Sequence, residues 1–246
     1  MEDKKATILS CHQVAKHYGA DPILDQVNLT LYRGELVSVL GQSGSGKTTL
    51  FNILAGLDQA DSGQVRAQAK LGYMLQKDML LPWKRLIDNV ALPLVLAGDK
   101  KENAREKASV YFETFGLEGL EARYPHQLSG GQRRRAALLR TYLHANELML
   151  LDEPFTGLDA ISRSQLHDWL IQHKEALGLS ILLITHDIEE ALVLSDRIYV
   201  LSQGPSASLW PPLDMGTVRE GSDRLLDLDR LRGEIRHRLF APLPPL

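Results

Sequence analysis

The stretch "ELVSVLGQSGSGKTTLFNIL", residues 35–54, decides the fold class of this chain. It opens with a short apolar run, typical of a buried strand, and closes with apolar residues at helical spacing. Between the two, "GQSGSGKT" at 41–48 matches the G-x-x-x-x-G-K-[ST] pattern of a phosphate-binding loop. The stretch predicts an α/β fold with a nucleoside-triphosphate site. The helix is expected over 48–57, with Leu57 on its apolar face.

Each part of this loop has an expected role in holding a nucleotide. The glycines let successive backbone N–H groups point at the phosphates. Lys47 supplies a point charge for the β- and γ-phosphates, and the Thr48 hydroxyl suits Mg²⁺. A glycine- and serine-rich loop without a ligand is the alternative, and the strand-loop-helix context argues against it. The residues expected to contact the nucleotide are Gly41, Ser43, Gly44, Ser45, Gly46, Lys47, Thr48 and Thr49.

A pair of acidic residues follows a second apolar run. "LMLLDEP" at 148–154 places Asp152 at the carboxyl end of a buried strand, where open α/β sheets bind their ligands. Asp152 can hold Mg²⁺ there, directly or through water. Glu153 is placed to polarise the attacking water. Two acids in a solvated turn are the alternative, but next to the phosphate loop the pair predicts hydrolysis of a magnesium-bound triphosphate.

Further apolar runs continue the α/β pattern along the chain. Strands are expected at 180–186 and 196–202, the second as the last strand, with an amphipathic helix over 161–177. The middle, about 77–145, has a different texture and is typical of a helical insertion. Within it, 99–116 is expected to form one charged helix. The residues on the apolar side of that helix are Ala104, Ala108, Phe112 and Phe115.

A second possible phosphate cradle occurs in "LSGGQRRRAALLR", residues 128–140. Ser129 is expected to cap a basic helix by accepting hydrogen bonds from its first backbone N–H groups. The glycines that follow allow close approach of a ligand, and helix N-termini attract anions. The helix dipole disfavours Arg133, Arg134 and Arg135 near this end, and a solvated charge cluster is their simplest interpretation.

The phosphate loop, "LSGGQ", "LLDEP" and "ITH" occur in an order that resembles the ATP-binding-cassette ATPase family over about residues 7–203. The resemblance implies a P-loop NTPase core with a mainly parallel sheet, an N-terminal antiparallel β part and a helical insertion subdomain. It implies one domain over 1–204. That domain would comprise a RecA-like core at 1–76 and 146–204 and a helical subdomain at about 77–145.

A C-terminal extension, 205–246, departs from generic family members. It is expected to be helical over 224–240. The simpler interpretation is a helix packed on the domain, and a helix that contacts a partner is the alternative. The stripe of apolar residues that supports a helix comprises Leu225, Leu228, Leu231, Ile235 and Leu239.

The resemblance also assigns roles to individual residues. In that family the serine-glycine turn meets the γ-phosphate held by a second copy, in a head-to-tail dimer with two ATP molecules at the interface. Gln76 resembles the glutamine that reaches Mg²⁺ and the attacking water, and His186 the switch histidine that contacts the γ-phosphate. Asp159 resembles the loop that crosses the dimer interface, and Tyr18 the aromatic residue that stacks on adenine. The residues of the turn are Ser129, Gly130, Gly131 and Gln132.

The resemblance implies partners as well. A single cassette implies a homodimer or a pair of ATPase subunits, with integral membrane permease subunits docking near Gln76. In the segment 78–94, "LLPW" is apolar where a solvated loop would be polar, which suggests a binding groove; core packing is the alternative. The residues of this segment are similar to those of importers of nitrate, sulfonate, taurine or thiamine-pyrimidine precursors, which also use a solute-binding protein. An exporter subunit, a soluble family member in translation or DNA repair, and a small-molecule kinase are the other possibilities.

Composition limits these possibilities further. The 246 residues carry a net charge of −3, which does not favour binding to nucleic acid. The single cysteine, Cys11, allows no internal disulfide and is expected to be a structural or surface thiol. The sequence shows neither a signal peptide nor the roughly 20 apolar residues of a membrane span. The chain is therefore expected at the cytoplasmic face of the cell membrane, held there by its partners.

Overall fold

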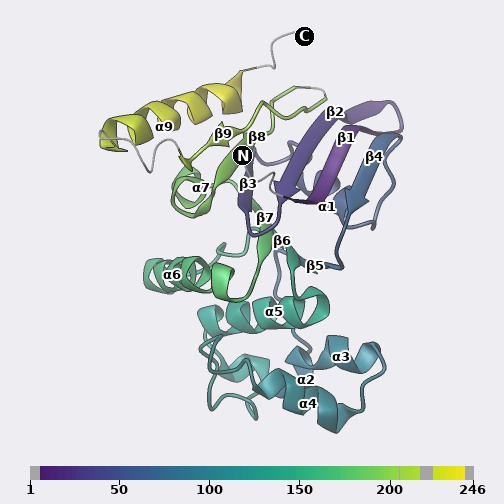
Figure 1. The fold of residues 1–246 in the computed structure, drawn as a ribbon, viewed down its shortest axis with the longest axis vertical. Coiled ribbons are helices and arrows are strands. Elements are labelled where there is room, and N and C mark those ends of the chain that lie inside the picture. Colours follow the sequence, from purple (N-terminus) through teal and green to yellow (C-terminus); the bar gives the residue numbers. More distant parts are fainter. Residues whose placement is uncertain (1–5, 205, 217–223, 242–246) are drawn as a thin grey trace. The chain divides into compact units, whose positions relative to one another are not determined.

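The structure is a computed structural model that describes residues 6–204, 206–216 and 224–241. The chain folds into two compact units (Figure 1). The first unit contains residues 1–69 and 180–246, and the second contains residues 70–179. None of the helices in the described ranges is long and apolar enough to cross a bilayer.

The first unit begins with the expected antiparallel β part. Strands β1 (Thr7–Tyr18) and β2 (Asp21–Tyr32) form a hairpin, and β4 (Ser62–Ala67) pairs with the other edge of β1. The three lie side by side in the order β2-β1-β4 (Figure 1). In β2, the apolar side chains of Val27, Leu29 and Leu31 are buried at alternating positions, as a sheet with one covered face requires. This part of the fold prediction is confirmed.

Parallel strands form the other sheet of this unit. Strand β3 (Leu36–Leu40) lies between β7 (Ser180–Thr185) and β8 (Arg197–Val200) and is parallel to both. Every residue of β3 and β7 is buried, which explains why their sequences are continuously apolar rather than alternating. Strand β9 (Leu213–Asp214) pairs antiparallel with β8. The prediction of 196–202 as the last strand was therefore wrong, since a two-residue strand is too short to leave a sequence pattern.

Helix α1 (Lys47–Leu54) follows the phosphate loop and is shorter than expected. Gly56 adopts a positive φ of 70°, a conformation typical of a residue just beyond a helix C-terminus. Leu57 lies beyond that end and is 69% exposed, so its place on the buried face was predicted wrongly. Helical spacing alone could not locate this end, because Leu57 continues the apolar period past the glycine.

The C-terminal helix α9 (Arg224–Phe240) packs against the parallel strands of the first unit. Ile235 and Leu239 are buried in one apolar cluster with Leu40 of β3 and with residues of β8 and α7 (Ile188–Leu194). In Figure 1, α9 is the yellow helix next to α7 and β9. The packing matches the simpler interpretation of this helix. Residues 205, 217–223 and 242–246 and the side chain of Leu225 lie outside the described residues.

The second unit contains the helical part of the fold. Two parallel strands, β5 (Leu71–Met74) and β6 (Leu148–Asp152), pair with each other, and α5 (Gly130–Ala145) packs on β5. Gly72 is required at this contact, because a Cβ there would lie 2.8 Å from the Thr141 carbonyl oxygen. The remaining helices are α2 (Leu86–Val90), α3 (Leu92–Leu96), α4 (Lys101–Ser109), the 3₁₀ turn η1 (Pro125–Gln127) and α6 (Ala160–Ala176).

Helix α4 is shorter than the single helix predicted over 99–116, because it ends at Ser109. Phe112 and Phe115 lie in the turns that follow and are nevertheless buried. The Phe115 ring packs 4.5 Å from the Trp169 ring of α6, centroid to centroid. The apolar residues were thus correctly expected inside, but two of them reach the core from turns rather than from a helix.

Candidate nucleotide-binding site

The phosphate loop of the first unit is shaped by two glycines. Gly44 and Gly46 have φ angles of 80° and 91°, which residues with a Cβ rarely adopt. A Cβ on Gly46 would also lie 3.1 Å from side-chain atoms of Ile23 and Leu24. Helix α1 begins at Lys47, directly after the second of these glycines. The backbone N–H groups of the first helical turn therefore open towards the loop, as anion binding requires.

Two polar side chains of this loop support a phosphate ligand. The Lys47 ammonium donates to the carbonyl oxygens of Gly41 at 2.8 Å and Gln42 at 2.6 Å, and only 8% of the residue is exposed. The Ser45 hydroxyl is buried and has no hydrogen-bond partner among the described residues. Buried polar atoms in folded proteins are normally hydrogen-bonded. The unpartnered hydroxyl and the charged lysine fit the oxygens of a bound triphosphate.

Gln42 ties this loop to the C-terminal helix, a contact that the sequence patterns did not predict. Its side-chain amide donates to the Leu239 carbonyl of α9 at 3.2 Å, and it accepts a hydrogen bond from Gln203. Gln42 occupies a variable position of the loop pattern, so no sequence rule marks it as a contact residue.

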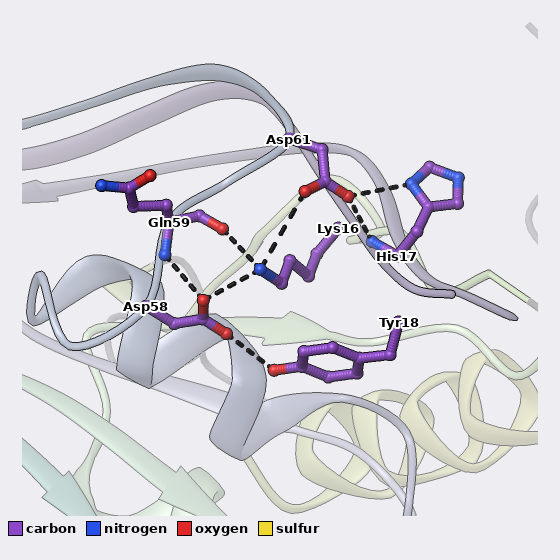
Figure 2. A network of polar contacts seen from close by, with 6 residues as sticks. All are labelled: Lys16, His17, Tyr18, Asp58, Gln59 and Asp61. Atoms are coloured by element: carbon purple, nitrogen blue, oxygen red, sulfur yellow. Dashed lines mark hydrogen bonds and ion pairs between the residues drawn. The ribbon is translucent and has the colours of Figure 1, made fainter. Parts of the chain in front are cut away.

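Tyr18 ends β1, and half of its surface is exposed. Its hydroxyl donates to Asp58 Oδ2 at 2.7 Å, and Figure 2 shows the two side chains within a larger polar network. Neither Asp58 nor its partner Lys16 belongs to a recognised motif, and sequence reasoning missed both.

His186 follows β7 and is exposed, in the turn that leads into α7. Hydrogen bonds hold this turn: the Thr185 hydroxyl donates to Glu190 Oε2 at 2.5 Å and accepts from the Asp187 N–H at 3.0 Å. Asp187 then caps α7 by accepting from the Glu189 N–H at 2.8 Å. Sequence reasoning missed Glu190, a 7%-exposed carboxylate that helps to fix the direction of the turn.

The acidic pair lies in the second unit at the carboxyl end of β6. Asp152 is 6% exposed, and the Tyr73 hydroxyl lies 3.4 Å from its Oδ2. Burial, together with the negative charge of Asp152, raises the pKa of Tyr73, so the phenol stays protonated and can donate. A buried carboxylate suits a divalent cation, since Mg²⁺ is typically held by one or two carboxylates plus phosphate oxygens.

Glu153 adopts a positive φ of 45°, which is uncommon for a residue with a Cβ. Its Oε2 accepts from the Gln76 side-chain amide at 3.1 Å and from the Thr156 hydroxyl at 3.0 Å. The structure thus brings together two of the predicted catalytic residues, which are 77 positions apart. Strained backbone of this kind is found at functional sites, where the surrounding structure enforces it.

The serine-glycine turn starts α5 with reciprocal hydrogen bonds. The Ser129 hydroxyl accepts from the Gln132 N–H at 3.2 Å, and Gln132 Oε1 accepts from the Ser129 N–H at 2.9 Å. This capping box confirms that Ser129 caps the helix. It also occupies the Gln132 side chain, which therefore supports the turn.

Asp159 lies close to this turn within the same unit. It caps α6, accepting from the Ser162 N–H at 2.9 Å and from the Ser162 hydroxyl at 2.7 Å. These hydrogen bonds lower the pKa of Asp159. A Cβ on Gly131 would lie 3.4 Å from Ser162 Cβ, so the turn and the start of α6 are neighbours.

The three arginines of α5 do not form the solvated cluster that was their simplest interpretation. Each is only partly exposed. Arg133 donates to the Leu128 carbonyl at 2.8 Å, and Arg134 donates to the Thr156 carbonyl at 3.1 Å. Arg135 approaches Gly116 so closely that a Cβ there would lie 2.3 Å from its guanidinium. Hydrogen bonds to backbone carbonyls therefore offset the unfavourable helix dipole.

The predicted site residues divide between the two units. Tyr18, the phosphate loop and His186 belong to the first unit. Gln76, the serine-glycine turn, the acidic pair and Asp159 belong to the second unit. Within the second unit, one cavity of about 350 Å³ is lined by both Gln76 and Gly130. The roles given to the individual residues remain predictions.

Comparison with known proteins identifies the family. The model of the ABC transporter family matches residues 24–156. The formylaminopyrimidine import ATP-binding protein ThiZ of Halalkalibacterium halodurans is 43% identical over 201 residues, which cover 80% of this chain and 81% of the relative. The taurine import ATP-binding protein TauB of Escherichia coli O157:H7 is 44% identical over 200 residues, 78% of each chain.

A solved structure agrees with these relatives. The dimeric post-hydrolysis state of the ATP-binding cassette MJ0796, bound to ADP and Pi, has a TM-score of 0.73 and 27% identity, and covers 85% of this chain and 99% of that one. The resemblance drawn from the order of the motifs and the expected fold class are both confirmed. The chain belongs to the ABC transporter family, whose ATP-binding subunits are ATPases.

Proposed function

We propose that this chain is the motor subunit of an importer for a small polar solute, driven by ATP binding and hydrolysis. The observation that carries the proposal is the naming of its relatives: two proteins at 43% and 44% identity, over about four fifths of the chain, are import ATP-binding proteins. Their cargoes are a formylaminopyrimidine and taurine. Nitrate, sulfonates, taurine and thiamine-pyrimidine precursors form the corresponding substrate range for this chain.

In the proposed site, ATP contacts the first unit through its phosphates and its base. The N–H groups at the start of α1 and the Lys47 ammonium hold the β- and γ-phosphates. The half-exposed Tyr18 ring stacks on the adenine, and His186 contacts the γ-phosphate from the turn after β7. The phosphate-loop geometry, with its buried lysine and unpartnered Ser45 hydroxyl, supports these assignments.

Glu153 is the proposed base that polarises the attacking water. Its hydrogen bonds to Gln76 and Thr156 fix the position of the carboxylate that would polarise the water. Thr48, Gln76 and Asp152 would hold Mg²⁺, which supplies positive charge to the β- and γ-phosphate oxygens when bound. Within the second unit, the buried carboxylate of Asp152 is a ligand type that suits a hard cation.

Dimer closure is the proposed source of movement. The Ser129 hydroxyl and the N–H groups of Gly130 and Gly131, at the start of α5, would bind the γ-phosphate of a second copy. Asp159 would cross the same interface. ATP then favours the closed state, and hydrolysis removes that preference. The dimeric arrangement of the related cassette MJ0796 supports this proposal.

The segment 78–94 is the proposed docking site for permease subunits, which would place the chain at the cytoplasmic face of the membrane. Trp83 is 71% exposed and Met79 is 57% exposed, which is unusual for large apolar side chains. Leu80 and Leu86 are buried, so at these two positions the segment packs into the core, as the alternative interpretation expected. The exposed half of the segment therefore supports a partner surface.

Growth of the source organism tests the proposal. Deletion of the gene should abolish growth on nitrate, a sulfonate or taurine as the sole nitrogen or sulfur source, or growth of a thiamine-requiring strain on a pyrimidine precursor, while growth on ammonium, sulfate and thiamine continues. The wild-type gene should restore growth, and a Glu153→Gln gene should not. Restoration by the Glu153→Gln gene, or normal growth of the deletion strain on every candidate solute, would contradict the proposed import function.

A further inference from the structure

Six polar residues form one network around the end of β1 (Figure 2). Lys16, His17 and Tyr18 come from β1, and Asp58, Gln59 and Asp61 come from the loop between α1 and β4. The loop therefore holds the end of the strand that presents Tyr18.

Tyr18 has two contacts in this network. Its hydroxyl donates to Asp58 Oδ2 at 2.7 Å. The Lys16 ammonium lies 5.1 Å from the centroid of its ring, within the range of a cation–π interaction. A half-exposed tyrosine without such contacts can turn among several side-chain rotamers, so these two contacts reduce the freedom of the ring.

Asp58 is itself held in place. Its Oδ1 accepts from the Lys16 ammonium at 2.9 Å and from the Gln59 N–H at 2.7 Å. Lys16 is only 8% exposed and donates in addition to the Gln59 carbonyl at 2.7 Å. The hydrogen bond from Lys16, followed by that from Tyr18, lowers the pKa of Asp58 to about 2, so the carboxylate stays ionised at neutral pH and accepts a charge-assisted hydrogen bond.

Asp61 belongs to the same network but not to the support of Tyr18. Its Oδ2 accepts from the His17 N–H at 2.6 Å and lies 3.2 Å from the His17 ring nitrogen. Its Oδ1 lies 4.0 Å from the Lys16 ammonium, at the outer limit for an ion pair. Asp58 and Asp61 thus carry the same charge in the same loop, and only Asp58 bonds to the tyrosine.

We propose that Asp58, anchored by Lys16, is a positioning residue that holds the ring of Tyr18 ready for the adenine of ATP. The inference rests on the adenine contact proposed for Tyr18. A ring already held in one orientation loses less conformational entropy when the base binds, and this raises affinity without adding a contact to the ligand. Asp58 touches the tyrosine hydroxyl and acts through it.

The test measures binding of two ligands by isothermal titration calorimetry on the full chain. ATP probes the base and the phosphates together, and inorganic tripolyphosphate probes the phosphates alone. Asp58→Ala removes the acceptor, and Tyr18→Phe removes the donor while keeping the ring. Asp61→Ala is the matched control, and Tyr18→Ala tests the proposed adenine contact itself. A thermal melt of each variant confirms folding.

We expect Asp58→Ala and Tyr18→Phe each to raise the Kd for ATP about fivefold, which is the effect of one hydrogen bond of average net strength. The double variant should be little weaker than either single one, because each single variant already lacks the Tyr18–Asp58 hydrogen bond. The Kd for tripolyphosphate should stay within about twofold, and Asp61→Ala should bind ATP like the wild type. If Asp58→Ala does not fold, Tyr18→Phe carries the same comparison.

Several results would overturn the inference. Unchanged ATP affinity in Tyr18→Phe, or equal losses for ATP and tripolyphosphate in Asp58→Ala, would remove the positioning role. A loss in Asp61→Ala as large as that in Asp58→Ala would show a general effect of charge. If Tyr18→Ala weakens ATP binding while Tyr18→Phe does not, only the inference fails. If Tyr18→Ala binds ATP normally, the proposed adenine contact fails with it.

Discussion

Replacing Ile235 by alanine tests how firmly the C-terminal helix is attached. Ile235 is fully buried in α9, in a cluster that includes Leu40 of β3 and Ile198 and Val200 of β8. The substitution removes the equivalent of three buried methylene groups, at roughly 0.8 kcal/mol each. Alanine favours the helix more than isoleucine by about 0.4 kcal/mol, which offsets part of that loss. The cavity left behind adds to it again.

The loss of burial exceeds the gain in helix propensity, so we expect the free energy of unfolding to fall by about 2–4 kcal/mol. For a chain of this size, the melting temperature should fall by about 5–12 °C. Differential scanning fluorimetry and urea unfolding both measure the change. Leu226→Ala is the matched control, because Leu226 lies on the same helix and is 61% exposed; its effect should stay within about 0.5 kcal/mol.

Equal shifts in the two variants would refute the reasoning, since burial alone distinguishes the two positions. So would a normal melting temperature for Ile235→Ala, because the helix would then not depend on this cluster for its attachment.

Three further predictions concern the site and the thiol. Glu153→Gln should keep ATP binding but trap a closed dimer, and only monomers on a sizing column run in ATP and Mg²⁺ would count against the role of Glu153. Lys47→Ala should weaken ATP binding by at least about 100-fold, because it removes charge-assisted bonds to the phosphates; calorimetry showing unchanged affinity would defeat this reading of the loop. Burial raises the pKa of Cys11 to about 12, so the native thiol should resist a disulfide reagent from pH 7 to 9 and react only after unfolding. The folded state holds the thiol proton more tightly than the unfolded state, whose pKa is about 8.5, so stability should fall as pH rises above that value, and Cys11→Ala should lack this part of the loss.

The sequence by itself determined the features that depend on neighbours along the chain. Strand β6 has the predicted bounds of the apolar run at 148–152. The cap formed by Ser129 and Gln132 was readable because it joins residues three positions apart. The order of the motifs was enough to identify the family, because each motif is a short stretch of sequence and the four occur in the order typical of that family.

Only the tertiary structure decided which distant residues meet. Asp58 and Tyr18 are 40 positions apart, and Gln76 and Glu153 are 77 apart. The latter pair was expected near one ligand, but no spacing rule predicted a direct hydrogen bond. No pattern marked Asp58 at all, because a lone aspartate in a turn-rich loop is usually a solvated residue.

The same reason explains the errors. Phe112 and Phe115 carry the helical period beyond the end of α4, because burial selects apolar residues whatever the local backbone. The arginines at the start of α5 were expected to be solvated, because the backbone carbonyls that accept hydrogen bonds from them cannot be identified from the local sequence. Helix caps and the spacing of apolar residues depend on residues that are close together in the chain, so they can be predicted from short stretches of sequence. Contacts across the fold depend on the path of the chain between them, which short stretches do not record.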